Sequence, residues 1–208
     1  MPLSKQLLYI GDFYEEAQNM MSTWGITDLF KTGDKGLDTY LGGGYGRHDG
    51  YEVVLLYGPT GVGKSTVALN LIAPAIRQEK KVGLLVVEDD MADVSVRMSK
   101  ILSRQDYASM NNDKRVLCLP KTALAASWKL TDLLDYIEDW FTNADVDLIL
   151  LDHLQFAFEG AEMIKGENEY IAQRIFMQKL NQLMKRVKKT IILVSHVNKA
   201  VGARGMDK

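Results

Sequence analysis

The chain has 208 residues, of which 47% are hydrophobic and 25% are charged, and its formal net charge is −2. These values are ordinary for one globular domain with a substantial core, and they exclude a disordered chain. The single cysteine, Cys118, excludes an internal disulfide, so a reducing cytoplasmic location is expected. No apolar run approaches the roughly 18 residues that a membrane span needs, so no membrane partner is expected.

The charge is unevenly distributed along the chain. Residues 164–208 carry ten Lys and Arg against three acidic residues, a net charge of +7, and residues 1–163 therefore carry −9. A basic carboxyl-terminal quarter can bind a polyanion. Solvated helix faces would give the same count, so the charge alone leaves both interpretations open.

The first part of the chain predicts one helix and a segment rich in turns. Residues 4–21 predict a short amphipathic helix, or a linker that forms one. Residues 30–52 are rich in glycine and polar side chains, which predicts turns around a short helix at 35–41. We expect residues 1–30 to be an amino-terminal linker or helix and residues 31–208 to be the folded core.

From residue 52 onward, apolar runs alternate with helical patterns. Continuous runs such as EVVLLY and TIILVSH predict strands that are covered on both faces. The expected strands are 52–57, 81–88, 115–120, 146–152 and 190–196. The expected helices are 64–80, 91–104, 127–143 and 170–188. This alternation predicts an α/β fold with a mostly parallel central sheet flanked by helices.

A phosphate-binding loop lies between the first expected strand and helix of this series. The stretch GPTGVGKS matches G-x-x-x-x-G-K-[ST] in full. Its backbone N–H groups and the helix N-terminus favour phosphates, Lys64 is expected to reach the β- and γ-phosphates, and Ser65 to ligate Mg²⁺. A plain glycine turn is the alternative, which the Lys-Ser pair argues against. The predicted nucleotide-binding residues are Gly58, Pro59, Thr60, Gly61, Val62, Gly63, Lys64, Ser65 and Thr66.

Two acidic residues at strand ends are candidates for the metal and for the attacking water. Asp152 ends an apolar strand and is expected to help hold Mg²⁺, although such an acid can also cap a helix or face solvent. Glu88 ends another strand and is the expected catalytic base, because strand ends converge on the ligand in an open α/β sheet. Asp89 and Asp90 are nearby rivals, and an ordinary surface acid is the alternative.

Together these stretches resemble the RecA-like ATPases, and among them the hexameric replicative helicases of the DnaB type and their phage relatives. TGDKGLDTYLGGG is similar to the family's leading segment, VVEDDM to its strand with the catalytic glutamate, and LILLDHLQ to its metal-site strand, where His153 stands in an aromatic position. GENEYIAQRIFMQKLNQLMKR resembles the helix after the first DNA loop. ILVSHVNK resembles the sensor strand, with His196 where many members have Gln and some phage members have His. The likeness runs from about residue 30 to residue 200.

The resemblance implies roles position by position. Glu88 would be the base, and His196 would read the γ-phosphate and report to the DNA loops, although a buried histidine at a strand end is the alternative. Residues 156–169 would form the first DNA loop, and residues 198–208 would begin the second. The candidates for contacts with DNA phosphates are Lys165, Lys199 and Arg204. Solvated surface charges are the alternative for these three.

The resemblance also implies a fold and a function. The fold would be a RecA-like core with strand order 3-2-4-5-1. The function would be an ATP-dependent DNA helicase or translocase that acts on single-stranded DNA in replication, with ATP or another nucleoside triphosphate and Mg²⁺. The partners would be single-stranded DNA, further copies in a hexameric ring, and a primase or helicase loader. A phage-encoded protein would act in the host cytoplasm.

Two other classes stay open, and the chain departs from the helicase pattern. One alternative is a RecA- or RadA-like recombination ATPase, and the other is a regulatory RecA-like ATPase that does not bind DNA. The chain lacks the amino-terminal helicase domain and the family's segment after the second loop, which carries the arginine that completes a neighbour's site. Either the chain is truncated or this function toward a neighbour has been lost, and we expect a core that is truncated at its carboxyl-terminal end.

Overall fold

The computed structural model describes residues 29–46, 51–86, 89–120, 130–154 and 169–196. Within these residues, five strands form one sheet in the order β1-β5-β4-β2-β3, and all neighbouring pairs are parallel. The strands are β1 (Glu52–Gly58), β2 (Val82–Val86), β3 (Val116–Pro120), β4 (Leu148–Asp152) and β5 (Thr190–His196). Read from β3 to β1, this is the predicted order 3-2-4-5-1, which is therefore confirmed.

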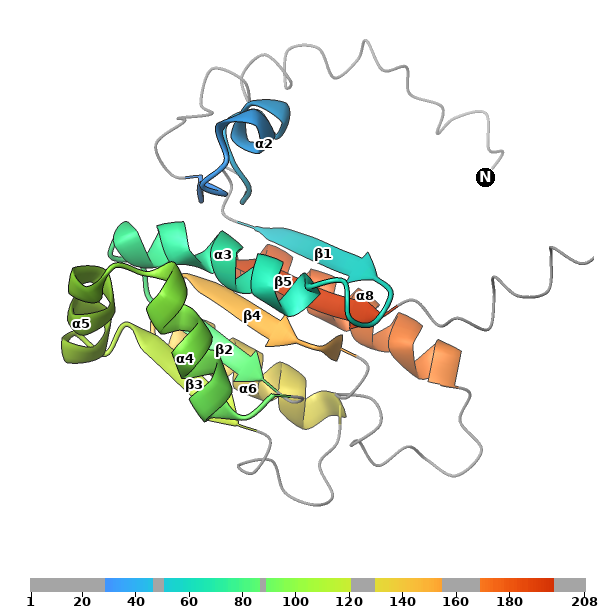
Figure 1. Ribbon diagram of the computed structural model, residues 1–208. Coiled ribbons are helices and arrows are strands. Elements are labelled where there is room, and N and C mark those ends of the chain that lie inside the picture. The colour runs from blue at the N-terminus through green and yellow to red at the C-terminus, as the bar shows by residue number, and fades with distance from the viewer. Residues whose placement is uncertain (1–28, 47–50, 87–88, 121–129, 155–168, 197–208) are drawn as a thin grey trace, which may run out of the picture.

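Helices cover both faces of the sheet. The described helices are α2 (Lys35–Tyr40), α3 (Lys64–Arg77), α4 (Met91–Ile101), α5 (Arg104–Asn112), α6 (Leu130–Thr142) and α8 (Glu169–Val187). In Figure 1, α3 and α4 lie in front of the sheet, and α6 and α8 lie behind it. Among the residues described, no helix has the length and apolar character that crossing a membrane requires.

Alternate residues of the central strands supply two core layers. Leu84 and Leu150 belong to the layer under α3 and α4, and Leu85 and Leu151 belong to the layer under α6 and α8. Successive side chains of a strand point to opposite faces, so a strand between two layers of helices needs apolar residues at every position. β2 and β4 are both buried along their whole length, and the one charged residue in either strand is Asp152 at the end of β4.

Gly83 near the start of β2 gives room to an aromatic side chain of α6. A Cβ atom at residue 83 would lie 2.4 Å from Cε3 of Trp140 and 3.1 Å from Cγ1 of Ile149. Trp140 is a buried residue of the core layer under α6 and α8. The indole therefore packs directly over the backbone of β2, where any larger residue would displace it.

The helix predicted at residues 91–104 is followed by a second helix that the sequence pattern does not predict. α4 ends at Ile101, and α5 begins at Arg104. Ser103 lies between them, and its hydroxyl accepts a hydrogen bond from the backbone N–H of Asp106 at 3.1 Å. This N-cap starts a new helix, so the predicted helix is confirmed with an earlier end and α5 is an addition to the prediction.

The segment before β1 packs onto α3. Phe30 and Tyr45 form an antiparallel bridge with two backbone hydrogen bonds of 2.9 Å. The Tyr45 hydroxyl donates to the carbonyl of Leu71 at 2.9 Å. Burial, followed by nearby carboxylates, raises the pKa of Tyr45 far above its usual range, so the hydroxyl keeps its proton. This hydrogen bond joins the segment to the middle of the helix that begins at the phosphate loop.

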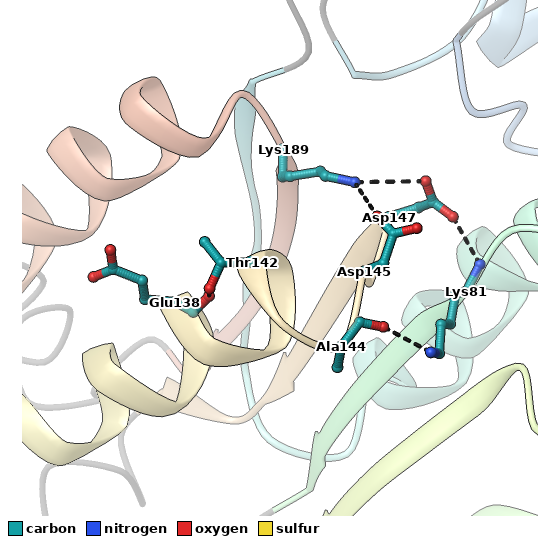
Figure 2. A network of polar contacts seen from close by, with 7 residues as sticks. All are labelled: Lys81, Glu138, Thr142, Ala144, Asp145, Asp147 and Lys189. Atoms are coloured by element: carbon teal, nitrogen blue, oxygen red, sulfur yellow. Dashed lines mark hydrogen bonds and ion pairs between the residues drawn. The ribbon is translucent and has the colours of Figure 1, made fainter.

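At the amino ends of the strands, five residues form what we call the amino-edge network (Figure 2). The backbone N–H of Lys81 donates to the carboxylate of Asp147 at 2.9 Å, and Lys81 Nζ donates to the carbonyl of Ala144 at 2.7 Å. Lys189 Nζ lies 3.7 Å from carboxylate oxygens of both Asp145 and Asp147. The network thus joins the residues that directly precede β2, β4 and β5.

Candidate nucleotide site

The turn between β1 and α3 leaves the start of α3 open to a ligand. Gly61 and Gly63 have φ angles of +83° and +88°, and a Cβ at either position would meet nothing within 4 Å, so the backbone conformation is what requires glycine here. Gly63 is the N-cap of α3, and no side chain of the described residues caps this helix. By contrast, the side chains of Asp34 and Asp90 cap α2 and α4. An uncapped helix N-terminus suits an anion.

Lys64 lies within hydrogen-bond distance of the start of the loop and of the end of β5. Its Nζ donates to the carbonyl of Pro59 at 2.8 Å and lies 2.9 Å from Nδ1 of His196. The Thr60 hydroxyl oxygen lies 3.2 Å from the same nitrogen. Gly58 at the end of β1 pairs with His196 at the end of β5, so the sheet brings the loop and the expected sensor residue together.

Asp152 and His153 follow one another at the end of β4, and the peptide bond between them is cis. Asp152 is only 5% exposed and pairs with Val86 of β2. His153 is 4% exposed, and its ring stands edge-on to that of His196, with a centroid distance of 4.1 Å and an interplanar angle of 81°. Because β5 lies between β1 and β4, Lys64, His196 and His153 form a continuous row of side chains.

The two acids that rival Glu88 have structural partners. Arg97 Nη1 donates to the carboxylate of Asp89 at 2.7 Å. The carboxylate of Asp90 accepts from the backbone N–H of Ala92 at 3.1 Å and caps α4. The side chain of Asp90 therefore caps α4, and the side chain of Asp89 forms an ion pair with Arg97 of the same helix.

Several predicted site residues lie outside the described residues. Glu88 is one of them, as are residues 156–168 of the first expected DNA loop and the whole of the second. The residues expected to contact DNA phosphates also lie outside the described residues, namely Lys165, Lys199 and Arg204. Their roles stay predictions.

The described residues fit the phosphates of a nucleotide together with Mg²⁺. Ser65 and Asp152 supply a hydroxyl and a carboxylate oxygen, which are ligands that Mg²⁺ accepts. Among the residues described, no group of three or more His, Cys, Asp and Glu side chains could hold a metal ion alone. Mg²⁺ usually takes one or two protein oxygens and completes its shell with phosphates and water, so the oxygens of Ser65 and Asp152 fit this ion.

Sequence reasoning did not assign His153 to the site. The structure adds it, through its contact with the ring of His196. The available signal was its position directly after Asp152, the last residue of a strand that the predicted order places next to the strand of His196.

Comparisons with known proteins agree with this architecture. A family model described as an AAA domain matches residues 44–202. A protein named RecA from Oceanobacillus iheyensis is 29% identical over 179 residues, which are 82% of this chain and 46% of that protein. A protein of the same name from Nitratiruptor sp. is 30% identical over 185 residues, which are 86% of this chain and 48% of that protein. The chain thus spans about half the length of these curated relatives.

A solved structure supports the fold. A KaiC-like protein from Pyrococcus horikoshii OT3 superposes with a TM-score of 0.62 at 21% identity, covering 80% of this chain and 69% of that chain. The predicted RecA-like fold is therefore confirmed. None of the relatives named here is a helicase of the DnaB type.

Proposed function

Because the chain belongs to the AAA domain family of P-loop ATPases, we propose that it uses hydrolysis of ATP to move along single-stranded DNA, as the core of a DnaB-type replicative helicase or translocase. The observation that carries the proposal is the convergence of Lys64, His196 and Asp152 at one edge of the sheet, the edge formed by the carboxyl ends of its strands. From that edge, at Leu154 and at His196, the chain continues into the two expected DNA loops. His196, which contacts Lys64 of the phosphate loop, thus lies two residues before the start of the second expected DNA loop.

The nucleotide roles follow from the site. Lys64 and the N–H groups at the start of α3 hold the β- and γ-phosphates. Ser65 and Asp152 hold Mg²⁺, which neutralises developing charge on the phosphates when it is bound. Glu88 orients the attacking water, a role supported by the structural engagement of Asp89 and Asp90.

The DNA roles rest on charge and on the resemblance of the flanking segments. Lys165, Lys199 and Arg204 contact DNA phosphates in this proposal, and residues 164–208 carry the net positive charge that such contacts need. A ring of identical subunits, served by a primase or a helicase loader, belongs to the same proposal, with residues 1–30 as its linker.

A recombination ATPase is a second candidate, favoured by one observation. Both curated relatives named RecA align over more than four fifths of this chain. Such a protein would bind single-stranded DNA as a filament and use ATP to time its release.

Three assays on one preparation separate these functions: ATP turnover with and without single-stranded DNA, unwinding of a forked duplex, and strand exchange. A helicase core is expected to be stimulated by DNA and to unwind the fork. Strand exchange without unwinding would support the recombination ATPase instead. If the protein binds nucleotide but its turnover does not change with DNA, both the helicase and the recombination ATPase are contradicted. A regulatory ATPase is then the remaining function.

The base is tested by Glu88→Gln, with Asp89→Asn as the matched control. A positioned general base contributes about 10²–10⁴-fold to the rate, so Glu88→Gln should keep nucleotide binding and lose turnover by that factor. Asp89→Asn should change turnover much less, because Asp89 pairs with Arg97. Near-parental turnover in Glu88→Gln would remove Glu88 from the site.

The DNA contacts are tested by alanine substitution of Lys165, Lys199 and Arg204, one at a time. Each change should weaken binding of single-stranded DNA equally for all sequences. Each should also reduce the slope of log affinity against log salt by about 0.7. Unchanged slopes for all three variants would identify ordinary solvated charges.

A further inference from the structure

Nδ1 of His196 lies within reach of two hydrogen-bond donors. Lys64 Nζ is 2.9 Å away and Thr60 Oγ1 is 3.2 Å away. A lysine ammonium only donates, so Nδ1 must be the acceptor, and the ring proton of the neutral imidazole is then on Nε2. Nδ1 has one lone pair in the ring plane, so the two donors compete for it. The shorter distance gives Lys64 the contact in this structure.

Binding of a triphosphate changes the balance of donors and acceptors at Lys64. The ammonium has three N–H groups. Two acceptors, the Pro59 carbonyl and Nδ1 of His196, already lie within 2.9 Å. The β- and γ-phosphates add two charged acceptors, which form stronger hydrogen bonds than neutral ones. Four acceptors then compete for three N–H groups, so one of the present contacts must break.

The contact with His196 is the one that can be replaced without movement of the ring. Thr60 Oγ1 already lies 3.2 Å from Nδ1, so its hydroxyl can donate as soon as Lys64 leaves. His153 keeps the imidazole in place, because its buried ring packs against the ring of His196 in a T-shaped contact with a centroid distance of 4.1 Å.

We propose that Thr60 replaces Lys64 as the donor to Nδ1 of His196 when a triphosphate binds, and that His153 is the positioning residue that holds the imidazole during this exchange. Thr60 occupies one of the freely variable positions of the G-x-x-x-x-G-K-[ST] pattern, so the motif itself assigns no role to its hydroxyl. The inference rests on the nucleotide site and not on the DNA role proposed above, so either can fail without the other.

The exchange is observable by nuclear magnetic resonance of the histidine ring nitrogens in the full chain. The sequence has three histidines, so spectra of His196→Gln and His153→Phe assign the signals. Samples are recorded without nucleotide, with Mg²⁺ and ADP, and with Mg²⁺ and a non-hydrolysable ATP analogue. Lys64→Met provides the reference for a His196 ring that has lost its ammonium donor.

The expected result has three parts. Lys64→Met should shift the Nδ1 signal of His196 in the absence of nucleotide. ADP should have little effect on the parent protein, because one terminal phosphate brings the number of acceptors to three. The ATP analogue should shift Nδ1 modestly in the parent and in Thr60→Ser, but in Thr60→Val the signal should move to the higher frequency of a nitrogen without a donor.

Two results would overturn the exchange. One is an identical response of the parent and Thr60→Val to the ATP analogue, when titration shows that both bind it. The other is an equal shift with ADP and with the analogue, which would contradict the count of acceptors.

The role of His153 is tested by comparing His153→Phe with His153→Leu. Phenylalanine keeps an aromatic ring beside His196 and should preserve the parental response to the analogue. Leucine fills the space without a ring. In the His153→Leu variant, the Nδ1 signal of His196 should therefore respond to the analogue in the same way whether residue 60 is Thr or Val. A Phe variant that is folded but responds like the Leu variant would show that the ring contact does not position His196.

Discussion

The two ends of the sheet use their polar groups differently. At the amino ends, the groups of the amino-edge network satisfy one another: the carboxylate of Asp147 receives the N–H of Lys81 and lies beside Lys189. At the carboxyl ends, a helix starts without a side-chain cap, and Lys64 and Thr60 share one acceptor on His196. The parallel strands run from the first of these ends to the second, and the arrows of β1 and β4 in Figure 1 show this direction.

This difference separates stability from ligand binding within one sheet. Groups that satisfy one another inside the chain lower the free energy of the folded state but have little capacity left for a ligand. Groups that compete for partners stabilise the fold less, and a ligand can reorganise them. We therefore expect substitutions at the amino ends to change unfolding and substitutions at the carboxyl ends to change nucleotide chemistry.

The largest expected effect is that of Lys64→Met on turnover. Loss of a donor that stabilises developing charge lowers turnover by about 10²–10³-fold. The free energy of unfolding in urea should stay within about 0.5 kcal/mol of the parent value, because Lys64 is a partly exposed residue at the start of α3. Turnover and unfolding are measured on the same sample. A clear loss of stability would break the proposed separation.

The next effect is that of Gly83→Ala on unfolding. The new Cβ would overlap the Trp140 ring, and overpacking of this kind costs about 1–3 kcal/mol. In a Trp140→Phe background the smaller ring leaves more room, so the same change should cost less. Nucleotide affinity of the folded fraction should not change. Equal effects in both backgrounds would show that Trp140 is not the obstacle.

A smaller effect is expected from charge removal in the amino-edge network. Asp147→Asn weakens the hydrogen bond from Lys81 N–H and removes a charge beside Lys189, which should cost about 1 kcal/mol in urea unfolding. Asp145→Asn is the matched control, since Asp145 lies at the same 3.7 Å from Lys189 but its side chain is 92% exposed. It should cost less than about 0.5 kcal/mol. Equal costs would assign the effect to Lys189 alone.

The smallest effect concerns the pH dependence at the start of α5. The hydrogen bond with Ser103 holds the pKa of Asp106 below its usual range, with the nearby Arg77 contributing in the same direction. A lowered pKa means that Asp106 stabilises the fold above its unfolded value of about 3.9, and that this contribution disappears as the pH falls through the lower folded value.

Titration of the Asp106 carboxyl by nuclear magnetic resonance checks this assignment. Ser103→Ala should raise the pKa towards its ordinary value. Ser99→Ala is the control, because its hydroxyl donates to the Val96 carbonyl within α4, whereas the pKa of Asp106 is lowered by Ser103 and Arg77. If the pKa of Asp106 stays low in Ser103→Ala, Arg77 and not Ser103 is its main cause.

Much of the fold could be predicted because the central strands are buried on both faces. Their continuous apolar runs are visible in the sequence, and β5 has the predicted bounds. The helix predicted to reach residue 80 ends at Arg77, where the chain turns through Glu79 with a φ of +62°. Helix ends depend on such local turns, which apolar spacing does not encode.

The parts of the site that could be predicted are those fixed by local spacing. The phosphate loop is contained in eight consecutive residues, so its motif reveals it. The contact of His153 with His196 joins two strands and depends on their side-chain geometry, which a linear pattern does not contain. The amino-edge network was hidden for the same reason, since its lysines and aspartates resemble ordinary solvated charges.

The pairing of β1 also affects how the protein is made. Within the described sheet, β1 pairs with β5, and Glu52 finds its partner Thr190 only 138 residues later in the chain. A ribosome that adds about 5–20 residues per second needs on the order of ten seconds to cover that interval. During this time the apolar strand has no partner and the phosphate loop has no His196. A nascent chain therefore exposes an aggregation-prone edge until β5 emerges, and chaperones that recognise extended apolar segments have that interval in which to bind it.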